Sequence, residues 1–143
     1  MDKIIIHNVP DFVEVSYRPD ILAVYLRWFS EYDEDSRVRT AVTAAVNYVN
    51  LHGVQNWLAD ISTSSRGLSD QDMEWVSGTE FSDAISHSTL RRFVMIPPLP
   101  ETGQDIEWLK NWERDTLSKF GNGVRAKLSD DMDEIRTFFS ETE

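Results

Sequence analysis

The chain has 143 residues, a formal net charge of −11 and a hydrophobic content of 41%, with five tryptophans and no cysteine. This length and apolar content suit one domain with one core, and the negative charge argues against a nucleic-acid partner, because such binding relies on lysine and arginine neutralising phosphates. The lack of cysteine excludes disulfides, thiolate zinc sites and cysteine nucleophiles, and it suits a cytoplasmic protein.

The first part of the chain predicts three strands. Residues 3–7, 12–17 and 21–28 are rich in β-branched and aromatic side chains, and turn residues separate them. The third run is apolar on both faces, which predicts a strand in the interior of a sheet. Only three consecutive apolar residues stand near the start of the sequence, so we expect neither a signal peptide nor a membrane span there.

A change of period follows these strands. Residues 33–53 place valine and alanine at helical spacing and end at Gly53, which predicts a helix. Residues 55–60 read as a second interior strand, ending at Asp60. We expect the next helix to begin with Ser69 as its cap. Its expected inward side chains are those of Met73, Val76, Phe81, Ala84 and Ile85.

The remaining elements alternate in the same way. Residues 91–96 predict a strand ended by Pro97, residues 103–121 a helix, residues 124–128 a strand, and the last residues a helix capped by Ser129. The order is βββαβαβαβα. This order predicts a single α/β domain over residues 1–143, with a mixed sheet that is parallel in its later part and covered by four helices.

Several of these motifs occur at matching places in a known group of domains. They are Trp57, Leu58 and Asp60 in a strand, Asp72 and Trp75 in the next helix, and Ile96 and Pro97 at the end of the next strand. In these features the chain resembles the STAS domains, and in particular the SpoIIAA-like bacterial proteins. The resemblance implies a SpoIIAA-like fold, and it implies a regulatory serine at or near Ser69. Leu68 and Asp70 flank Ser69, where the family has an Asp-Ser-Ser-Gly stretch.

The junction between the strand ending at Asp60 and the helix beginning at Ser69 is the candidate interaction or regulatory site. Its candidate residues are Asp60, Ser62, Ser64, Ser65, Arg66 and Ser69. For Ser69 we favour a helix cap over a phosphate acceptor. For Asp60 we favour hydrogen bonds to loop N–H groups over a ligand role. The loop serines could cradle an anion, although their composition is also typical of a solvated loop.

Trp108 and Trp112 lie four residues apart, on one stripe of the helix expected over residues 103–121. Three interpretations remain open for this pair. The two rings could form the face of a weak homodimer, line the wall of a lipid pocket, or complete the core.

No catalytic, metal-binding or cofactor-binding motif stands out, so we expect no enzymatic activity, no metal and no cofactor. The leading hypothesis is a regulatory protein-interaction module of the SpoIIAA-like type with an unidentified protein partner. The alternative is a carrier with an apolar groove for a small molecule or lipid. A hydrolase or transferase ranks third, because no nucleophile-base pair can be recognised.

Overall fold

The computed structural model describes residues 3–33, 35–64, 66–102 and 124–140. Six strands form one mixed sheet, in which each strand lies beside its neighbours in the sequence. Strands β1 to β3 pair antiparallel, and β3 to β6 pair parallel. The strand bounds are Ile4–Val9 (β1), Val13–Arg18 (β2), Ala23–Trp28 (β3), Asn56–Asp60 (β4), Arg92–Ile96 (β5) and Arg125–Leu128 (β6).

Both strands predicted to be interior occupy the middle of the sheet. Strand β3 lies between β2 and β4, and β4 lies between β3 and β5. All five residues of β4 are buried. The apolar side chains on both faces of these strands are therefore buried, because helices cover the sheet on both sides.

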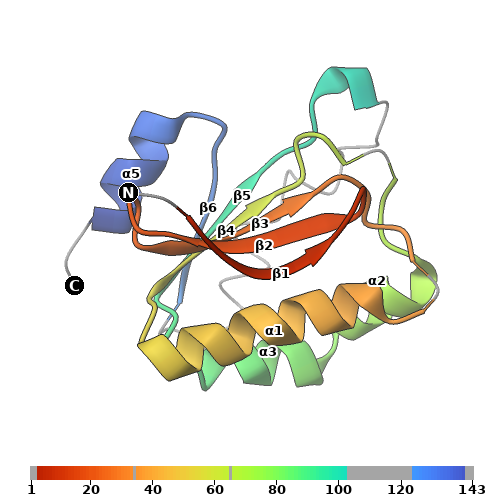
Figure 1. Ribbon diagram of the computed structural model, residues 1–143, viewed down its shortest axis with the longest axis horizontal. Coiled ribbons are helices and arrows are strands. Elements are labelled where there is room, and N and C mark those ends of the chain that lie inside the picture. The colour runs from red at the N-terminus through yellow and green to blue at the C-terminus, as the bar shows by residue number, and fades with distance from the viewer. Residues whose placement is uncertain (1–2, 34, 65, 103–123, 141–143) are drawn as a thin grey trace.

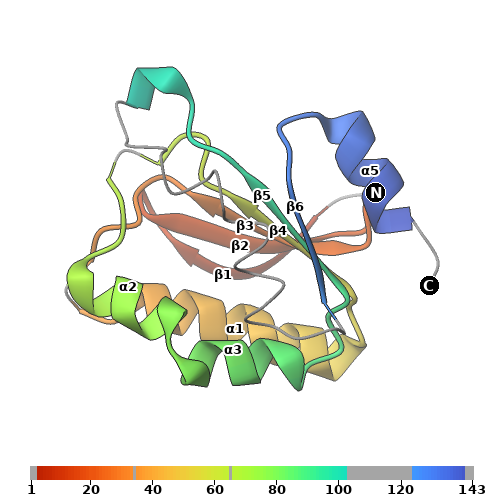
Figure 2. The same ribbon diagram turned by 180° about the vertical axis from the view of Figure 1, so that it is seen from behind.

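The helices cover the two faces unequally (Figures 1 and 2). Helices α1, α2 and α3 lie on one face, and α5 lies on the other. The crossovers after β3 and β4 thus place their helices on the same face, as connections of one hand that step in one direction along a sheet require. The helix bounds are Arg37–His52 (α1), Asp70–Ser77 (α2), Thr79–Ser86 (α3) and Met132–Ser140 (α5), with a short 3-10 turn at Pro100–Thr102 (η1).

Helix α1 ends as predicted. Gly53 adopts the left-handed conformation, with φ of 66°, and its N–H donates to the carbonyl oxygen of Val49. At the other end, the Asp33 carboxylate accepts hydrogen bonds from the N–H of Arg37 at 2.8 Å and from its guanidinium group at 2.7 Å. Burial alone would raise the pKa of Asp33, but these hydrogen bonds hold it below its usual value.

The prediction of a single helix after Ser69 is wrong, because the structure has two helices there. Gly78 interrupts the helical path with ψ of 179°, and it is both the last cap of α2 and the first cap of α3. This break changes which side chains face the sheet. Met73 is 50% exposed and Ala84 is exposed, whereas both were expected inside.

Two apolar clusters lie on either side of the sheet. The larger one packs α1 and α3 against the sheet and contains the stacked rings of Trp57 and Phe93, whose centroids lie 5.6 Å apart. The smaller one packs Ile135, Phe138 and Phe139 of α5 against the sheet. Of the described elements, only α5 and η1 stand on this second face (Figure 1).

The last helix begins two residues later than predicted. The Asp131 carboxylate accepts the N–H groups of Asp133 and Glu134, whereas the Ser129 hydroxyl accepts the N–H of Asp131. Asp131 therefore caps α5 and Ser129 shapes the turn before it. The helix expected over residues 103–121 lies outside the described residues.

Candidate functional site

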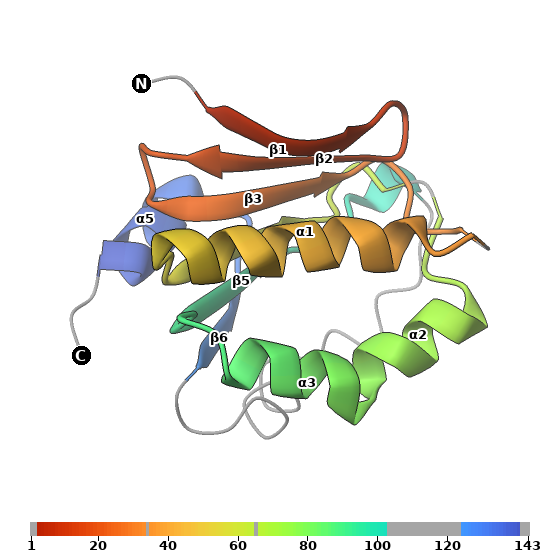
Figure 3. The same cartoon turned by 60° about the horizontal axis from the view of Figure 1, so that its bottom comes forward.

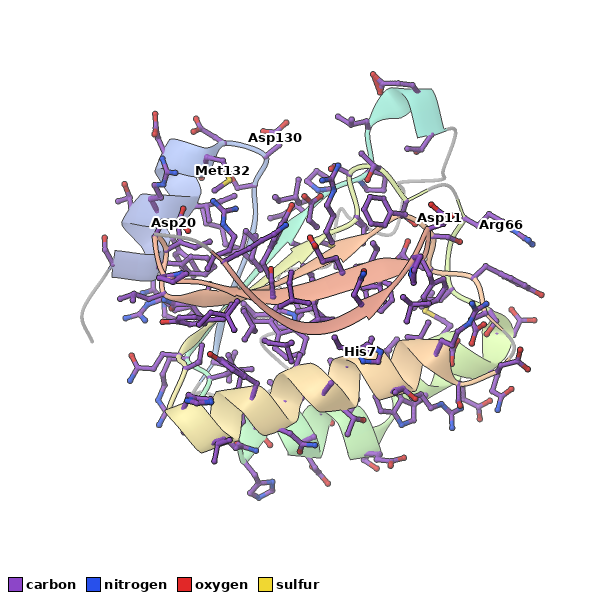
Figure 4. All side chains as sticks on the ribbon, in the orientation of Figure 1. His7, Asp11, Asp20, Arg66, Asp130 and Met132 are labelled. Carbon is purple, nitrogen blue, oxygen red and sulfur yellow. The ribbon has the colours of Figure 1, made fainter. Side chains whose placement is uncertain are left out.

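The predicted junction leaves the sheet at the carboxyl end of the parallel strands. Strand β4 ends at Asp60, the loop over residues 61–69 follows, and α2 begins at Asp70. Figure 4 shows the Arg66 side chain projecting from this loop into solvent, at the end of the sheet far from Asp20. Open parallel sheets commonly present their binding groups at this end.

Asp60 is the centre of the hydrogen bonds at this junction. Its side chain accepts the N–H of Ser62 at 2.9 Å, the hydroxyl of Ser62 at 2.6 Å and the hydroxyl of Tyr25 at 2.5 Å. Only 7% of Asp60 is exposed. The predicted bond from Asp60 to a loop N–H group is thus confirmed for Ser62, and it forms a local turn that starts the loop.

Tyr25 reaches Asp60 from the neighbouring strand. Arg27 of β3 pairs with Asp60 of β4, so Tyr25, two residues before Arg27, presents its ring on the same face of the sheet as the carboxylate. Burial raises the pKa of Tyr25 well above its usual value, and the hydrogen bond to Asp60 adds to this shift. The phenol therefore stays protonated and acts as a hydrogen-bond donor.

Ser64 ties the loop to the segment that follows β3. Its hydroxyl lies 2.8 Å from Glu31 Oε2 and 3.0 Å from the carbonyl oxygen of Arg66, so it has two acceptors within reach. The N–H of Glu31 donates to the carbonyl oxygen of Arg66 at 2.8 Å. Ser64 has no exposed surface. The Ser64 hydroxyl thus bonds within the protein, and the anion-binding interpretation of the loop serines stays a prediction.

Two more contacts hold the loop. The Arg66 guanidinium carbon lies 3.9 Å from the centre of the Tyr32 ring, a cation–π arrangement. The carbonyl oxygen of Ser62 accepts the N–H of Leu99, which belongs to the segment after β5. The loop is therefore fastened to the segments on both sides of it in the sheet.

Ser69 caps α2, as predicted. Its hydroxyl accepts the N–H of Asp72 at 3.2 Å. The carboxylate of Asp72 is buried and lies 3.6 Å from the Arg39 guanidinium of α1. The Asp72 side chain thus joins α2 to α1.

The polar groups at this junction are bonded within the protein. Both carboxylate oxygens of Asp60 are hydrogen-bonded, and the Ser64 hydroxyl beside Glu31 is inaccessible to a substrate in this loop conformation. Nowhere among the described residues do three or more histidine, cysteine or acidic side chains gather closely enough to hold a metal ion.

Among the hollows of the described surface, two are open and include three charged side chains each. One, of about 390 Å³, is bordered by Arg39, Glu74, Trp75 and Glu80 between α1, α2 and α3. The other, of about 340 Å³, lies beside α5 and is lined by Lys127, Asp133, Glu134, Thr137 and Phe138.

The structure brings together more residues than the sequence indicated. Tyr25, Glu31 and Tyr32 join the junction from the strand and segment before α1, and no local spacing connects them to it. The alternation of side chains along β3, combined with a parallel pairing to β4, could have indicated Tyr25. Of the predicted residues, Ser65, Trp108 and Trp112 lie outside the described residues.

Comparisons of the chain with protein-family models, curated proteins and solved structures find no match. The resemblance to the STAS domains therefore rests on the sequence motifs and stays a prediction. None of the described helices combines the length and the apolar character needed to cross a membrane.

Proposed function

We propose that this chain is a non-enzymatic regulatory protein-interaction module of the SpoIIAA-like type, acting in the cytoplasm. Its recognition surface is the outer side of the loop over residues 61–69 together with the first turn of α2. The proposal rests on the direction of the loop's polar groups, which point inward and bond within the protein. Asp60 and Ser64 are buried and hydrogen-bonded within the protein, so they fix the loop and leave other side chains to meet a partner.

The side chains left outside are suited to protein recognition. Thr63, Arg66 and Met73 are exposed, and we call them the junction surface. Arginine and methionine are enriched in protein interfaces, and Arg66 adds a cation to a surface that also carries the exposed carboxylate of Asp70. Because the loop is already fastened, binding costs little of the ordering entropy that a free loop would lose.

The carrier hypothesis has less support from the described residues. An apolar ligand needs a concave pocket lined mainly by apolar side chains. The two hollows described above instead include several charged groups in their linings. We therefore place the carrier second, and native mass spectrometry of protein purified without detergent tests it, since a carrier should retain an apolar molecule.

Site-specific photo-cross-linking in the source cells tests the interaction module. A photo-reactive amino acid in place of Met73, which is 50% exposed, should give one discrete cross-linked protein. The same amino acid in place of Leu22 is the matched control, because Leu22 is 62% exposed in the turn at the other end of β3.

Arg66→Glu reverses the charge of the junction surface and should abolish the Met73 product. Circular dichroism checks that this variant remains folded. The proposal fails if the Met73 and Leu22 positions give the same products, or if Arg66→Glu leaves the Met73 product unchanged.

A further inference from the structure

Strand β1 is an open edge of the sheet. Among the described strands it pairs with β2 alone. Ile4 and Ile5, in its first half, are each 50% exposed. An apolar edge strand presents unpaired backbone N–H and C=O groups beside apolar side chains, and it is a ready template for pairing with another chain.

A β-bulge divides the open edge of β1 into two parts. Ile5 pairs with Ser16 and His7 pairs with Val15, so Ile6 is an additional residue without its own partner in β2. Bulges disturb regular pairing and increase the local twist. The exposed Ile4 and Ile5 form the part before the bulge, and the part after it pairs regularly from His7 to Val9.

Helix α1 continues this surface on one side of the sheet (Figure 3). Ile4 pairs with Tyr17 of β2, and the Tyr17 ring lies 5.6 Å from the Tyr48 ring of α1. Leu51, one turn away from Tyr48 on the helix, is 79% exposed. We call Ile4, Ile5, Tyr17, Tyr48 and Leu51 the β1–α1 flank.

The β1–α1 flank faces away from the rest of the helical layer. On α1, the residue that contacts α2 is Arg39, which lies 3.6 Å from Asp72. At 100° per residue, Tyr48 projects about 180° away from Arg39 around the helix axis. The Tyr48 ring instead packs on Tyr17 of β2 and on His52 of α1 itself.

The charge of this flank differs from that of the whole chain. The net charge is −11, yet neither β1 nor α1 contains an aspartate or a glutamate. The nearest acid on β2, Glu14, forms an ion pair with Lys3 at 2.8 Å. Two copies that meet through this flank avoid the repulsion between carboxylates that opposes association of an acidic protein.

We propose that the β1–α1 flank is the interface of a homodimer. The first half of β1 pairs antiparallel with the same stretch of a second copy, about a two-fold axis normal to the sheet. Such an axis keeps both helical layers on the same side, so Tyr48 and Leu51 of each copy border the paired strands. The arrangement is self-complementary, because apolar residues meet apolar residues, and the described carboxylate on β2, that of Glu14, is paired with Lys3.

The size of the β1–α1 flank sets the expected affinity of the dimer. Even if the contact ran along all 16 residues of α1, about 24 Å, and through both layers, about 20 Å deep, its footprint would be at most about 500 Å². Stable interfaces bury about 800 Å² of accessible surface on each partner. The flank is therefore smaller than a standard interface, and the dimer should be weak and dissociate on dilution.

Sedimentation velocity over a series of protein concentrations tests this proposal. The wild-type mass should rise from the monomer value of 16.5 kDa towards twice that value. Ile5→Lys places two cations next to each other across the axis, and Leu51→Lys places a cation in the apolar border. Each should weaken the dimer by about tenfold or more.

Leu99→Lys is the matched control, because Leu99 is also an exposed apolar side chain, 42% exposed, but lies in the segment after β5. It should leave the mass curve unchanged. Leu51 stands on the outside of a helix, so Leu51→Lys decides the matter even if Ile5→Lys unfolds. A monomer at every concentration overturns the proposal. So does a dimer that Trp112→Lys abolishes while Ile5→Lys and Leu51→Lys preserve it.

Discussion

The hydrogen bond between Tyr25 and Asp60 joins two central strands, so its removal should destabilise the fold measurably. Tyr25→Phe deletes the hydroxyl that donates to Asp60 Oδ2 at 2.5 Å and changes little else in the shape of the side chain. Because Asp60 is only 7% exposed, water cannot easily replace the lost donor.

The expected loss of unfolding free energy follows from the kind of hydrogen bond that Tyr25→Phe removes. A hydrogen bond to a charged group contributes about 1.5 to 3 kcal/mol, and the carboxylate oxygen left behind is buried, so we expect a loss of about 2 kcal/mol. For a chain of this length the melting temperature should fall by about 6 °C. Asp60→Ala also removes the acceptor for both Ser62 donors and should cost about 3 kcal/mol.

Urea and thermal unfolding of the two single variants and the double variant measure the coupling between the residues. If the bond is the source of the effect, Tyr25→Phe should cost almost nothing once Asp60 is alanine. An undiminished cost in the Asp60→Ala background would refute the reasoning, because the hydroxyl would then act through another partner.

Alkaline pH gives a second measurement on the same bond. The pKa of Tyr25 is raised in the folded state, first by burial and then by Asp60. Its contribution to stability is therefore complete below the unfolded value of about 10 and is lost as the pH rises through the folded value. The difference in unfolding free energy between the wild type and Tyr25→Phe should shrink over this range.

Two further predictions concern helix starts. Ser69→Ala should lower the free energy of unfolding by about 1 kcal/mol, whereas Ser69→Asp should keep most of it, since aspartate also caps a helix and suits its dipole. Thermal melts compare the two variants. Equal losses would show that the Ser69 hydroxyl has a role beyond the cap. The pKa of Asp33 is lowered in the folded state, so its contribution is present above about pH 4 and is lost as the pH falls through the folded value. Acid titrations of stability should accordingly converge for wild type and Asp33→Asn, and curves that stay parallel would contradict this cause.

The strands and α1 could be predicted because their patterns had no competing interpretation. The valines of residues 38–49 repeat at helical spacing and stop at Gly53, whose positive φ suits few other residues. The helix after Ser69 could not be predicted whole. A glycine within a helical pattern is tolerated often enough that Gly78 did not signal a break, and the break turned Met73 outward.

The candidate site was predictable only where its contacts are local. The Ser62 bond to Asp60 and the Ser69 cap span two and three residues, and residue type alone indicates them. The partners Tyr25 and Glu31 lie 35 and 33 residues away in sequence from Asp60 and Ser64. They meet because β3 and β4 pair in one particular register, which depends on the packing of the whole sheet.

The order of the strands has a consequence for how the chain folds. Because every strand pairs with its sequence neighbour, the sheet can grow by adding each new strand to the edge formed by the previous one. Each addition closes a modest loop, which keeps the entropic barrier low and favours folding as the chain leaves the ribosome. Of the described strands, β1 is synthesised before the others and no later one covers its outer edge, so nascent chains on neighbouring ribosomes present the same free edge to one another before synthesis is complete.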